Sequence, residues 1–221
     1  DALYSTLLGS DNVSALTIAS FVGRDLVSRR GSGTPIAAFV SEMNNLARSL
    51  RMTKTRFTAP HGLDAGNAVS TSCALDMALL GMYSMQNPAF CYIVSQASRR
   101  IGVQSQTKGT TMYDISNNNK MMSTPGVDGI KAGSSRAAGQ CLLLSATRNA
   151  IARRSPQTGT EVIYPQRMII AVLGTGERYS LARQMLNTGW RVWENWQASG
   201  MDMKDPKEFV QLPVKSGTEK R

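Results

Sequence analysis

Residues 125–133 have the sequence Pro-Gly-Val-Asp-Gly-Ile-Lys-Ala-Gly, and this stretch does most to decide how the chain folds. Residues 127–131 have the pattern of a short β-strand, and the strand ends in the small residues Ala132 and Gly133. Similar β-like runs occur in the same half of the chain at residues 100–103, 111–115, 141–147 and 167–173. Gly139 and the Pro- and Gly-containing segment 153–160 separate some of these runs. We therefore expect an antiparallel sheet in the second half of the chain.

Helical patterns dominate the first half of the chain. Apolar residues recur there at spacings of three and four, which predicts helices over residues 13–22, 36–50 and 74–85. Thr34-Pro35 is typical of an N-cap followed by proline in the first turn. We expect Ser70 or Ser72 to cap the third helix and Asn87-Pro88 to end it.

A last helix is predicted after the strands. It spans residues 177–196, and its packed stripe is expected to hold Leu181, Met185, Trp193 and Trp196. The polar, charged segment that follows is interrupted by proline. The sequence therefore predicts one domain over residues 1–197 and a polar tail or linker over residues 198–221.

Composition excludes several classes of protein. The formal net charge is +10, but the basic residues occur mostly as scattered pairs such as Arg29-Arg30 and Arg99-Arg100, so we expect no nucleic-acid partner. The longest apolar runs are strand-sized, which is too short to span a bilayer. One histidine and three widely spaced cysteines do not form a zinc-binding pattern. We expect the thiols of Cys73, Cys91 and Cys141 to be buried and no metal or cofactor to be bound.

Two tripeptides carry candidate chemistry. Ser10-Asp11-Asn12 lies ahead of the first predicted helix, and Lys131-Ala132-Gly133 ends the strand described above. Taken alone, the first is typical of a helix cap and the second of a solvent-facing strand. Together they match two of the three signatures that line one cleft in serine acyl enzymes, the third being S-x-x-K.

The sequence around both tripeptides resembles that of the S11 family of D-alanyl-D-alanine carboxypeptidases, the low-molecular-mass penicillin-binding proteins. The resemblance covers nearly all of residues 1–197, and its most specific blocks are residues 43–50, Pro60-His61-Gly62-Leu63-Asp64, residues 117–120, residues 125–131 and Arg136-Ala137-Ala138-Gly139. It implies an α+β, β-lactamase/transpeptidase-like fold in which an antiparallel sheet is flanked by helices and joined by a helical subdomain. The first strands and the nucleophile helix of that fold are expected to be missing, so the chain resembles an N-terminally truncated member.

The activity implied by this resemblance is removal of the terminal D-Ala from peptidoglycan stem peptides through a serine acyl-enzyme. Ser10 would relay a proton to the departing amine, and Asn12 would hold the peptide group of the substrate. Asp11 is expected to stay peripheral.

The second tripeptide is expected to bind the end of the substrate. Lys131 would attract the terminal carboxylate, and Gly133 would let the substrate approach the strand closely. The backbone N–H of Ser134 would be an oxyanion donor. Ala132 stands where the family usually has threonine, which predicts weaker binding of substrate and of β-lactams.

Two further motifs are excluded from the predicted site. The one S-x-x-K match, Ser105-Gln106-Thr107-Lys108, follows the Ser-Asp-Asn block in a strand-and-turn stretch, whereas the acyl enzymes place their nucleophile earlier at a helix start. His61 is assigned to a structural loop.

Two other functions remain open at this point. A class A β-lactamase shares the Ser-Asp-Asn signature but needs a glutamate in an E-x-x-L-N context, which Glu42-Met43-Asn44-Asn45 does not supply. A catalytically dead peptidoglycan-binding homologue would explain Ala132 and the missing nucleophile motif. For the carboxypeptidase, the resemblance implies a periplasmic or other extracytoplasmic location in the cell envelope and inhibition by β-lactams. Membrane association would come from segments outside this chain.

Overall fold

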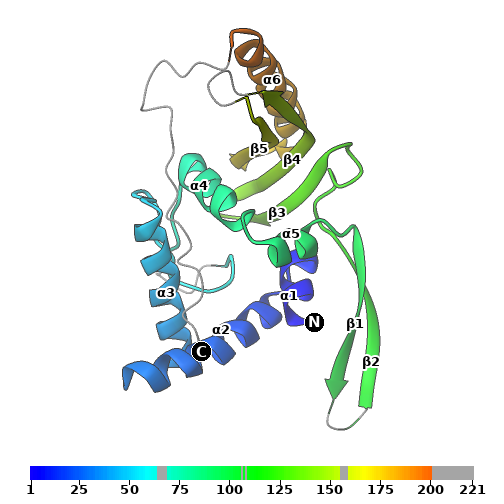
Figure 1. Ribbon diagram of the computed structural model, residues 1–221. Coiled ribbons are helices and arrows are strands. Elements are labelled where there is room, and N and C mark those ends of the chain that lie inside the picture. The colour runs from blue at the N-terminus through cyan, green and yellow to red at the C-terminus, as the bar shows by residue number, and fades with distance from the viewer. Residues whose placement is uncertain (64–68, 106, 108, 155–158, 201–221) are drawn as a thin grey trace.

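The computed structural model describes residues 1–63, 69–105, 107, 109–154 and 159–200, and Figure 1 shows how their helices and strands are arranged. The helices of the first half are α1 (Ala2–Tyr4), the π-helix η1 (Ser5–Gly9), α2 (Asn12–Arg30), α3 (Pro35–Ser49), α4 (Ala74–Ser84) and α5 (Pro88–Val94). The second half holds β1 (Ser98–Ser105), β2 (Gly109–Ser116), β3 (Val127–Ser135), β4 (Gly139–Arg154), β5 (Glu161–Thr175) and α6 (Arg178–Ala198). Every helix and strand predicted from the sequence is therefore present.

The turn between α2 and α3 forms as the sequence predicts. Gly31 ends α2 in a left-handed conformation, with φ at 79°, which a residue without a Cβ adopts without strain. Thr34 caps α3, because its hydroxyl accepts a hydrogen bond from the Ala37 N–H at 3.3 Å. The two helices pack closely at Gly23, where an added Cβ would lie 2.0 Å from the Pro35 carbonyl oxygen.

The ends of α4 differ from the prediction. Cys73 is the N-cap residue and makes no side-chain capping bond, so the expected cap at Ser70 or Ser72 is wrong. Both serine hydroxyls are instead used across the preceding loop, where Ser72 pairs with Thr55 at 2.8 Å. Asn87 does follow the end of α4, but its side chain also accepts bonds from the first N–H groups of α5, a helix that the sequence pattern did not predict.

The strands form two antiparallel sheets rather than one. β1 and β2 pair as a separate hairpin, which Figure 1 shows extending away from the rest of the molecule. The other sheet has the order β3-β4-β5, so β3 is an edge strand. This edge position leaves one side of β3, including the strand end at residues 131–135, without a neighbouring strand.

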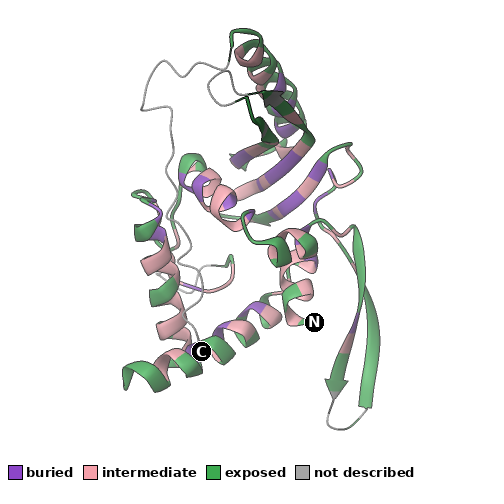
Figure 2. Cartoon of the chain, in the orientation of Figure 1, coloured by how far each residue is buried: buried purple, intermediate pink, exposed green. Residues whose placement is uncertain are grey.

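The largest core cluster lies between the three-stranded sheet and α6. Figure 2 shows the buried residues following β3, β4 and one side of α6. On α6 the buried stripe consists of Ala182, Leu186 and Trp190, with Trp193 packed beside them. Leu181 and Met185 are 38% and 45% exposed, so their predicted place in the stripe is wrong. The stripe passes one residue further along the helix because Gly189 meets Met168 of β5 there.

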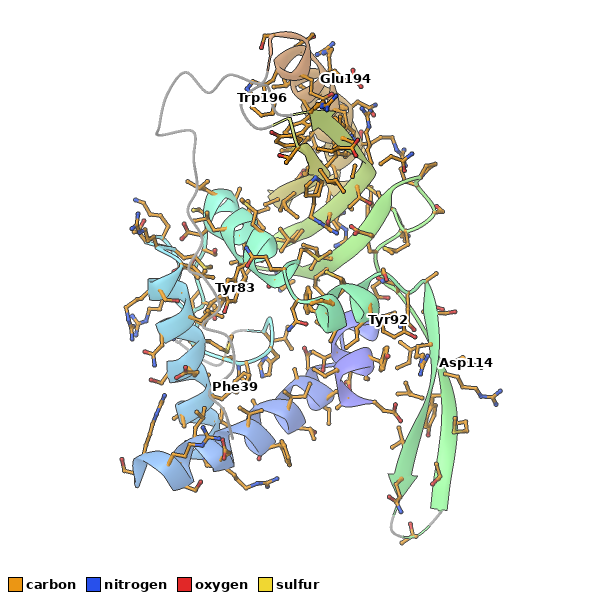
Figure 3. All side chains as sticks on the ribbon, in the orientation of Figure 1. Phe39, Tyr83, Tyr92, Asp114, Glu194 and Trp196 are labelled. Carbon is orange, nitrogen blue, oxygen red and sulfur yellow. The ribbon has the colours of Figure 1, made fainter. Side chains whose placement is uncertain are left out.

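A second cluster holds the helical half together. Leu50 and Met52 beyond the end of α3 are buried with Ala47 of α3 and Leu79 of α4. Tyr83, which is labelled in Figure 3, lies on α4 and packs against the same cluster. The helical half thus has a core of its own, as expected for the helical subdomain.

Three further sequence predictions concern the cysteines, membrane-spanning helices and the C-terminal tail. Cys73, Cys91 and Cys141 are free thiols but only half-buried, so the prediction that they are buried is wrong. Within the residues that the structure describes, no helix combines the length and apolar character required to cross a bilayer. The predicted tail lies almost entirely outside the described residues.

We predict that Gly23→Ala destabilises the protein. Alanine favours helices by about 1 kcal/mol over glycine, but the new methyl would overlap the Pro35 carbonyl, and overpacking of this kind typically costs about 1–3 kcal/mol. Urea denaturation measures the free energy of unfolding. The matched control is Gly62→Ala, where an added Cβ meets no atom within 4 Å. A Gly23→Ala variant as stable as this control would contradict the close approach of α2 and α3.

Candidate active site

The Ser-Asp-Asn tripeptide and the Lys-Ala-Gly tripeptide meet in space. The Lys131 Nζ on β3 donates a hydrogen bond of 2.6 Å to the Ser10 Oγ, which lies just ahead of α2. The two residues are 121 positions apart in the chain, so only the tertiary fold brings them together. The expected convergence of these segments is therefore confirmed.

The loop around Ser10 has an unusual backbone conformation. Ser10 adopts a left-handed conformation, with φ at 63° and ψ at 36°, between η1 and α2. Such conformations cost a non-glycine residue about 1–3 kcal/mol and gather at functional sites. Asp11 follows as the N-cap of α2 and accepts bonds from the Val13 and Ser14 N–H groups. Its hydrogen bonds, first from the Ser14 hydroxyl, lower the pKa of the Asp11 carboxyl.

A turn of three asparagines, residues 117–119, fixes this loop against the sheet. Asn118 donates from its side chain to the Gly9 carbonyl at 2.9 Å and from its backbone to the Leu8 carbonyl at 3.0 Å. The side chain of Asn119 is almost fully buried and donates to the Gly129 carbonyl of β3 at 3.2 Å. Adjacent residues of one turn thus hold the Ser10 loop and the Lys131 strand.

The ammonium group of Lys131 lies in an unfavourable electrostatic setting. It donates to Ser10 and to the Ala132 carbonyl oxygen, and the residue is half-buried. Burial, with a further contribution from the positive charge of Arg178, lowers the pKa of Lys131 from 10.5 to about 8. Among the described residues, neither of these cations forms an ion pair with a carboxylate. An anion from outside the chain would therefore be stabilised between them.

Arg178 belongs to this candidate site by its position, and the sequence analysis missed it. It is the first residue of α6, and its guanidinium donates at 2.6 Å to the carbonyl of Gly133, two residues beyond Lys131 on β3. The guanidinium also lies over the ring of Tyr179, whose hydroxyl donates to the Asn118 carbonyl at 2.9 Å. A signal was present, because the helix dipole disfavours a cation in the first turn and so suggests another role for it.

The remaining predicted site residues line the same edge in different ways. Asn12 begins α2 and is exposed, and its side chain has no hydrogen-bond partner within the described part of the chain. Gly133 and Ser134 are exposed near the end of β3. Ala132 is 3% exposed, and its methyl group packs in the core cluster beneath the sheet. Only the backbone carbonyl of Ala132, which accepts a hydrogen bond from Lys131, takes part in the candidate site.

The motifs excluded at the sequence level lie elsewhere. Ser105 ends β1 and Gly109 begins β2, so the S-x-x-K match spans a connection between two strands rather than a helix start. Gln106 and Lys108 lie outside the described residues. His61 Nδ1 accepts a bond from the Leu63 N–H within its own loop, and Asp64 of the same block is also outside the described residues. No three histidine, cysteine or acidic side chains cluster as metal ligands in the part of the chain that can be described.

Comparison with known proteins gives one consistent result. The model of a family described as D-alanyl-D-alanine carboxypeptidase, peptidase family S11, matches residues 1–155. The D-alanyl-D-alanine carboxypeptidase DacA of Escherichia coli K12 is 29% identical over 189 residues, which are 83% of this chain and 40% of the relative. DacC of the same organism is 30% identical over 164 residues, or 71% of this chain and 34% of the relative. The chain therefore spans well under half the length of these relatives.

The fold is similar to that of solved DD-peptidases. A serine-to-alanine mutant of the Streptomyces K15 DD-transpeptidase superposes with a TM-score of 0.68 at 25% identity, covering 86% of this chain and 67% of that one. The mixed architecture of antiparallel sheets and helices thus matches the penicillin-binding, β-lactamase-like fold expected from the sequence. These comparisons do not favour the class A β-lactamase alternative.

We predict that the pKa of Lys131 is about 8 in the folded chain. NMR titration of its side-chain Cε, assigned by comparison with Lys131→Met, measures this value. Arg178→Gln should raise the pKa by removing a nearby positive charge, whereas Arg178→Lys should leave it nearly unchanged. Titration of wild-type Lys131 near its ordinary 10.5 would contradict the half-buried environment beside Arg178 described above.

The same shift predicts how stability depends on pH. Between about 8 and 10.5 the unfolded chain keeps the Lys131 proton that the folded chain has lost, so the free energy of unfolding rises with pH. Lys131→Met should lack this rise. The test is to compare urea denaturation of both proteins across that range, and parallel pH profiles would argue against the shift.

Proposed function

The chain belongs to the S11 family of D-alanyl-D-alanine carboxypeptidases, and from this premise we propose that it forms the substrate-binding side of a serine-type carboxypeptidase site. The reaction is removal of the terminal D-Ala from peptidoglycan stem peptides through an acyl-enzyme, as part of cell-wall remodelling. The names of the relatives and the fold support this proposal, and residues 1–197 are proposed as the domain that carries it.

The observation that carries the proposal is the unpaired cationic edge beside Ser10. Lys131 lies on edge strand β3, and Arg178 of α6 bonds to Gly133 of the same strand, where an extended peptide can approach the backbone. A free C-terminal carboxylate is the anion that such a pair selects in a peptide substrate. Selection for a free terminus is what a carboxypeptidase requires.

The residues beside this edge have distinct proposed roles. Ser10 is close enough to Lys131 to relay a proton toward the departing D-alanine amine. Asn12, with its exposed amide, holds the peptide group of the substrate. Gly133 allows close approach of the substrate backbone, and the Ser134 N–H is proposed as one oxyanion donor. Ala132 lacks the hydroxyl of the usual threonine, which weakens binding of substrate and of β-lactams.

The nucleophile is not assigned to a residue of this chain. The only S-x-x-K in its sequence connects two strands, and the proposed acyl-enzyme needs a serine and lysine on one face of a helix start. We therefore expect the isolated chain to bind D-Ala-D-Ala peptides while releasing D-alanine only negligibly. Appreciable D-alanine release by the purified chain would contradict this assignment.

The proposed surroundings follow from the substrate. Peptidoglycan lies outside the cytoplasmic membrane, so a periplasmic or extracytoplasmic location in the cell envelope is proposed. β-Lactams are the proposed inhibitors because they mimic the D-Ala-D-Ala end, and neither nucleic acid nor a cofactor has a role in the mechanism. Any membrane association is assigned to segments outside this chain.

Peptide binding tests the proposal. The chain should bind a diacetylated L-Lys-D-Ala-D-Ala peptide, and the same peptide with a C-terminal amide should bind more weakly. Lys131→Met and Arg178→Gln should each lose a charge-assisted bond worth about 1.5–3 kcal/mol, or roughly 10- to 100-fold in Kd. Isothermal titration calorimetry measures these values.

The pH dependence of binding gives an internal check. Lys131 attracts the carboxylate only as an ammonium, so affinity should fall as pH rises through about 8. Lys54→Arg, at an exposed lysine, is the matched control and should bind like the wild type. Equal affinity for the acid and the amide peptide would overturn the proposed role of this edge.

A further inference from the structure

Ser10 combines three features that a proton relay alone does not require. Its backbone is in the left-handed region, immediately ahead of a 19-residue helix. It is exposed, so its hydroxyl can be reached from solvent. Its Oγ lies 2.6 Å from an amine nitrogen. A serine on a sharp turn before a helix, in contact with a base, is the arrangement of an activated nucleophile.

The amine beside Ser10 is suited to act as that base. Lys131 has no carboxylate partner among the described residues, so no ion pair holds its proton in place. Burial and the charge of Arg178 lower the pKa of Lys131 to about 8, where a substantial fraction is neutral in mildly alkaline solution. The ammonium donates a hydrogen bond to Ser10, whereas the neutral amine can accept one from the Ser10 hydroxyl.

The charged groups around Lys131 are consistent with this role. Arg178 comes from α6 and opposes protonation, while Leu143, opposite Lys131 on β4, is apolar. Asp11 comes from the loop ahead of α2, but its carboxylate is held by the hydroxyl and N–H of Ser14. The nearby acid is therefore engaged in capping its own helix and does not pair with Lys131.

We propose that Ser10 and Lys131 form a serine–lysine dyad in which the Ser10 Oγ takes an acyl group from activated esters, independently of any S-x-x-K serine. This activity goes beyond the proton relay described above. Its substrates are small esters with a phenolate-type leaving group, because a phenolate departs without a proton whereas a peptide amine needs one.

The chemical step balances without any other reactant. Neutral Lys131 Nζ takes the hydroxyl proton of Ser10 as the Oγ attacks the ester carbonyl carbon. The bond from that carbon to the leaving oxygen then breaks. The products are an O-acyl Ser10, a free phenolate and the Lys131 ammonium, which together with Arg178 stabilises negative charge developing on the way.

Acetylation by p-nitrophenyl acetate tests the proposal on the whole chain. Intact-mass spectrometry should show one acetyl group per chain, and peptide mapping should place it on Ser10. The adduct should be an ester and so be removed by hydroxylamine. Its rate of formation should rise about tenfold per pH unit below about 8 and level off above, following neutral Lys131.

Matched variants separate the dyad from general reactivity. Ser10→Gly removes the nucleophile while suiting the positive φ, so the fold should be kept, as circular dichroism can verify. Lys131→Arg keeps the charge but cannot act as a base, and should slow acetylation by about 100-fold or more. Ser95→Ala and Lys54→Arg alter an exposed serine and an exposed lysine elsewhere and should have no effect.

Several results would overturn the dyad. An adduct that resists hydroxylamine on Lys131 would show that the amine itself is the nucleophile. Acetylation that persists unchanged in Ser10→Gly, or that maps to another residue, or that fails in the wild type, would equally reject it. Peptide binding by Lys131 and Arg178 is measured in a separate experiment. A negative acetylation result therefore rejects only the dyad, and a negative binding result rejects only the proposed substrate site.

Discussion

The hydrogen bond from Lys131 to Ser10 is the contact on which the whole site depends. It joins an edge strand to the start of a helix across 121 residues of chain, and its donor is a half-buried ammonium that forms no ion pair with a carboxylate among the described residues. Partial removal of this charge from water is unfavourable, and it lowers the pKa of Lys131 together with the charge of Arg178. A group kept in that state is ready to bind an anion or to give up its proton, and these are the two uses proposed for it.

The asparagine turn at residues 117–119 holds the Ser10 loop and the Lys131 strand together. The turn binds the end of η1 on one side and β3 on the other. Tyr179 of α6, whose ring lies under the Arg178 guanidinium, donates a hydrogen bond to the Asn118 carbonyl of the turn. The left-handed backbone of Ser10 is further supported by the Asp11 cap of α2. The ends of η1, β3 and α6 are therefore tied to the same turn, which fixes the relative positions of Ser10, Lys131 and Arg178 in the candidate site.

Local chemistry made much of the fold predictable from the sequence. Apolar spacing located α2, α3 and α4, Thr34-Pro35 located a helix start, and β-like runs located the strands. Tertiary contacts explain the errors. Whether β1 and β2 join the main sheet depends on partners that no local pattern encodes, and the stripe on α6 is displaced because Gly189 packs on Met168. Ser10 and Lys131 were found because each lies in a motif, whereas Arg178 becomes a site residue only when the first turn of α6 reaches β3.

A crystal structure of the chain tests the central claim most directly, because that claim is a distance. We expect electron density that places the Lys131 Nζ within hydrogen-bonding distance of the Ser10 Oγ, with Arg178 bonded to the Gly133 carbonyl of β3. Density that places the Ser10 loop and the end of β3 on separate surfaces, too far apart to contact one small molecule, would contradict it.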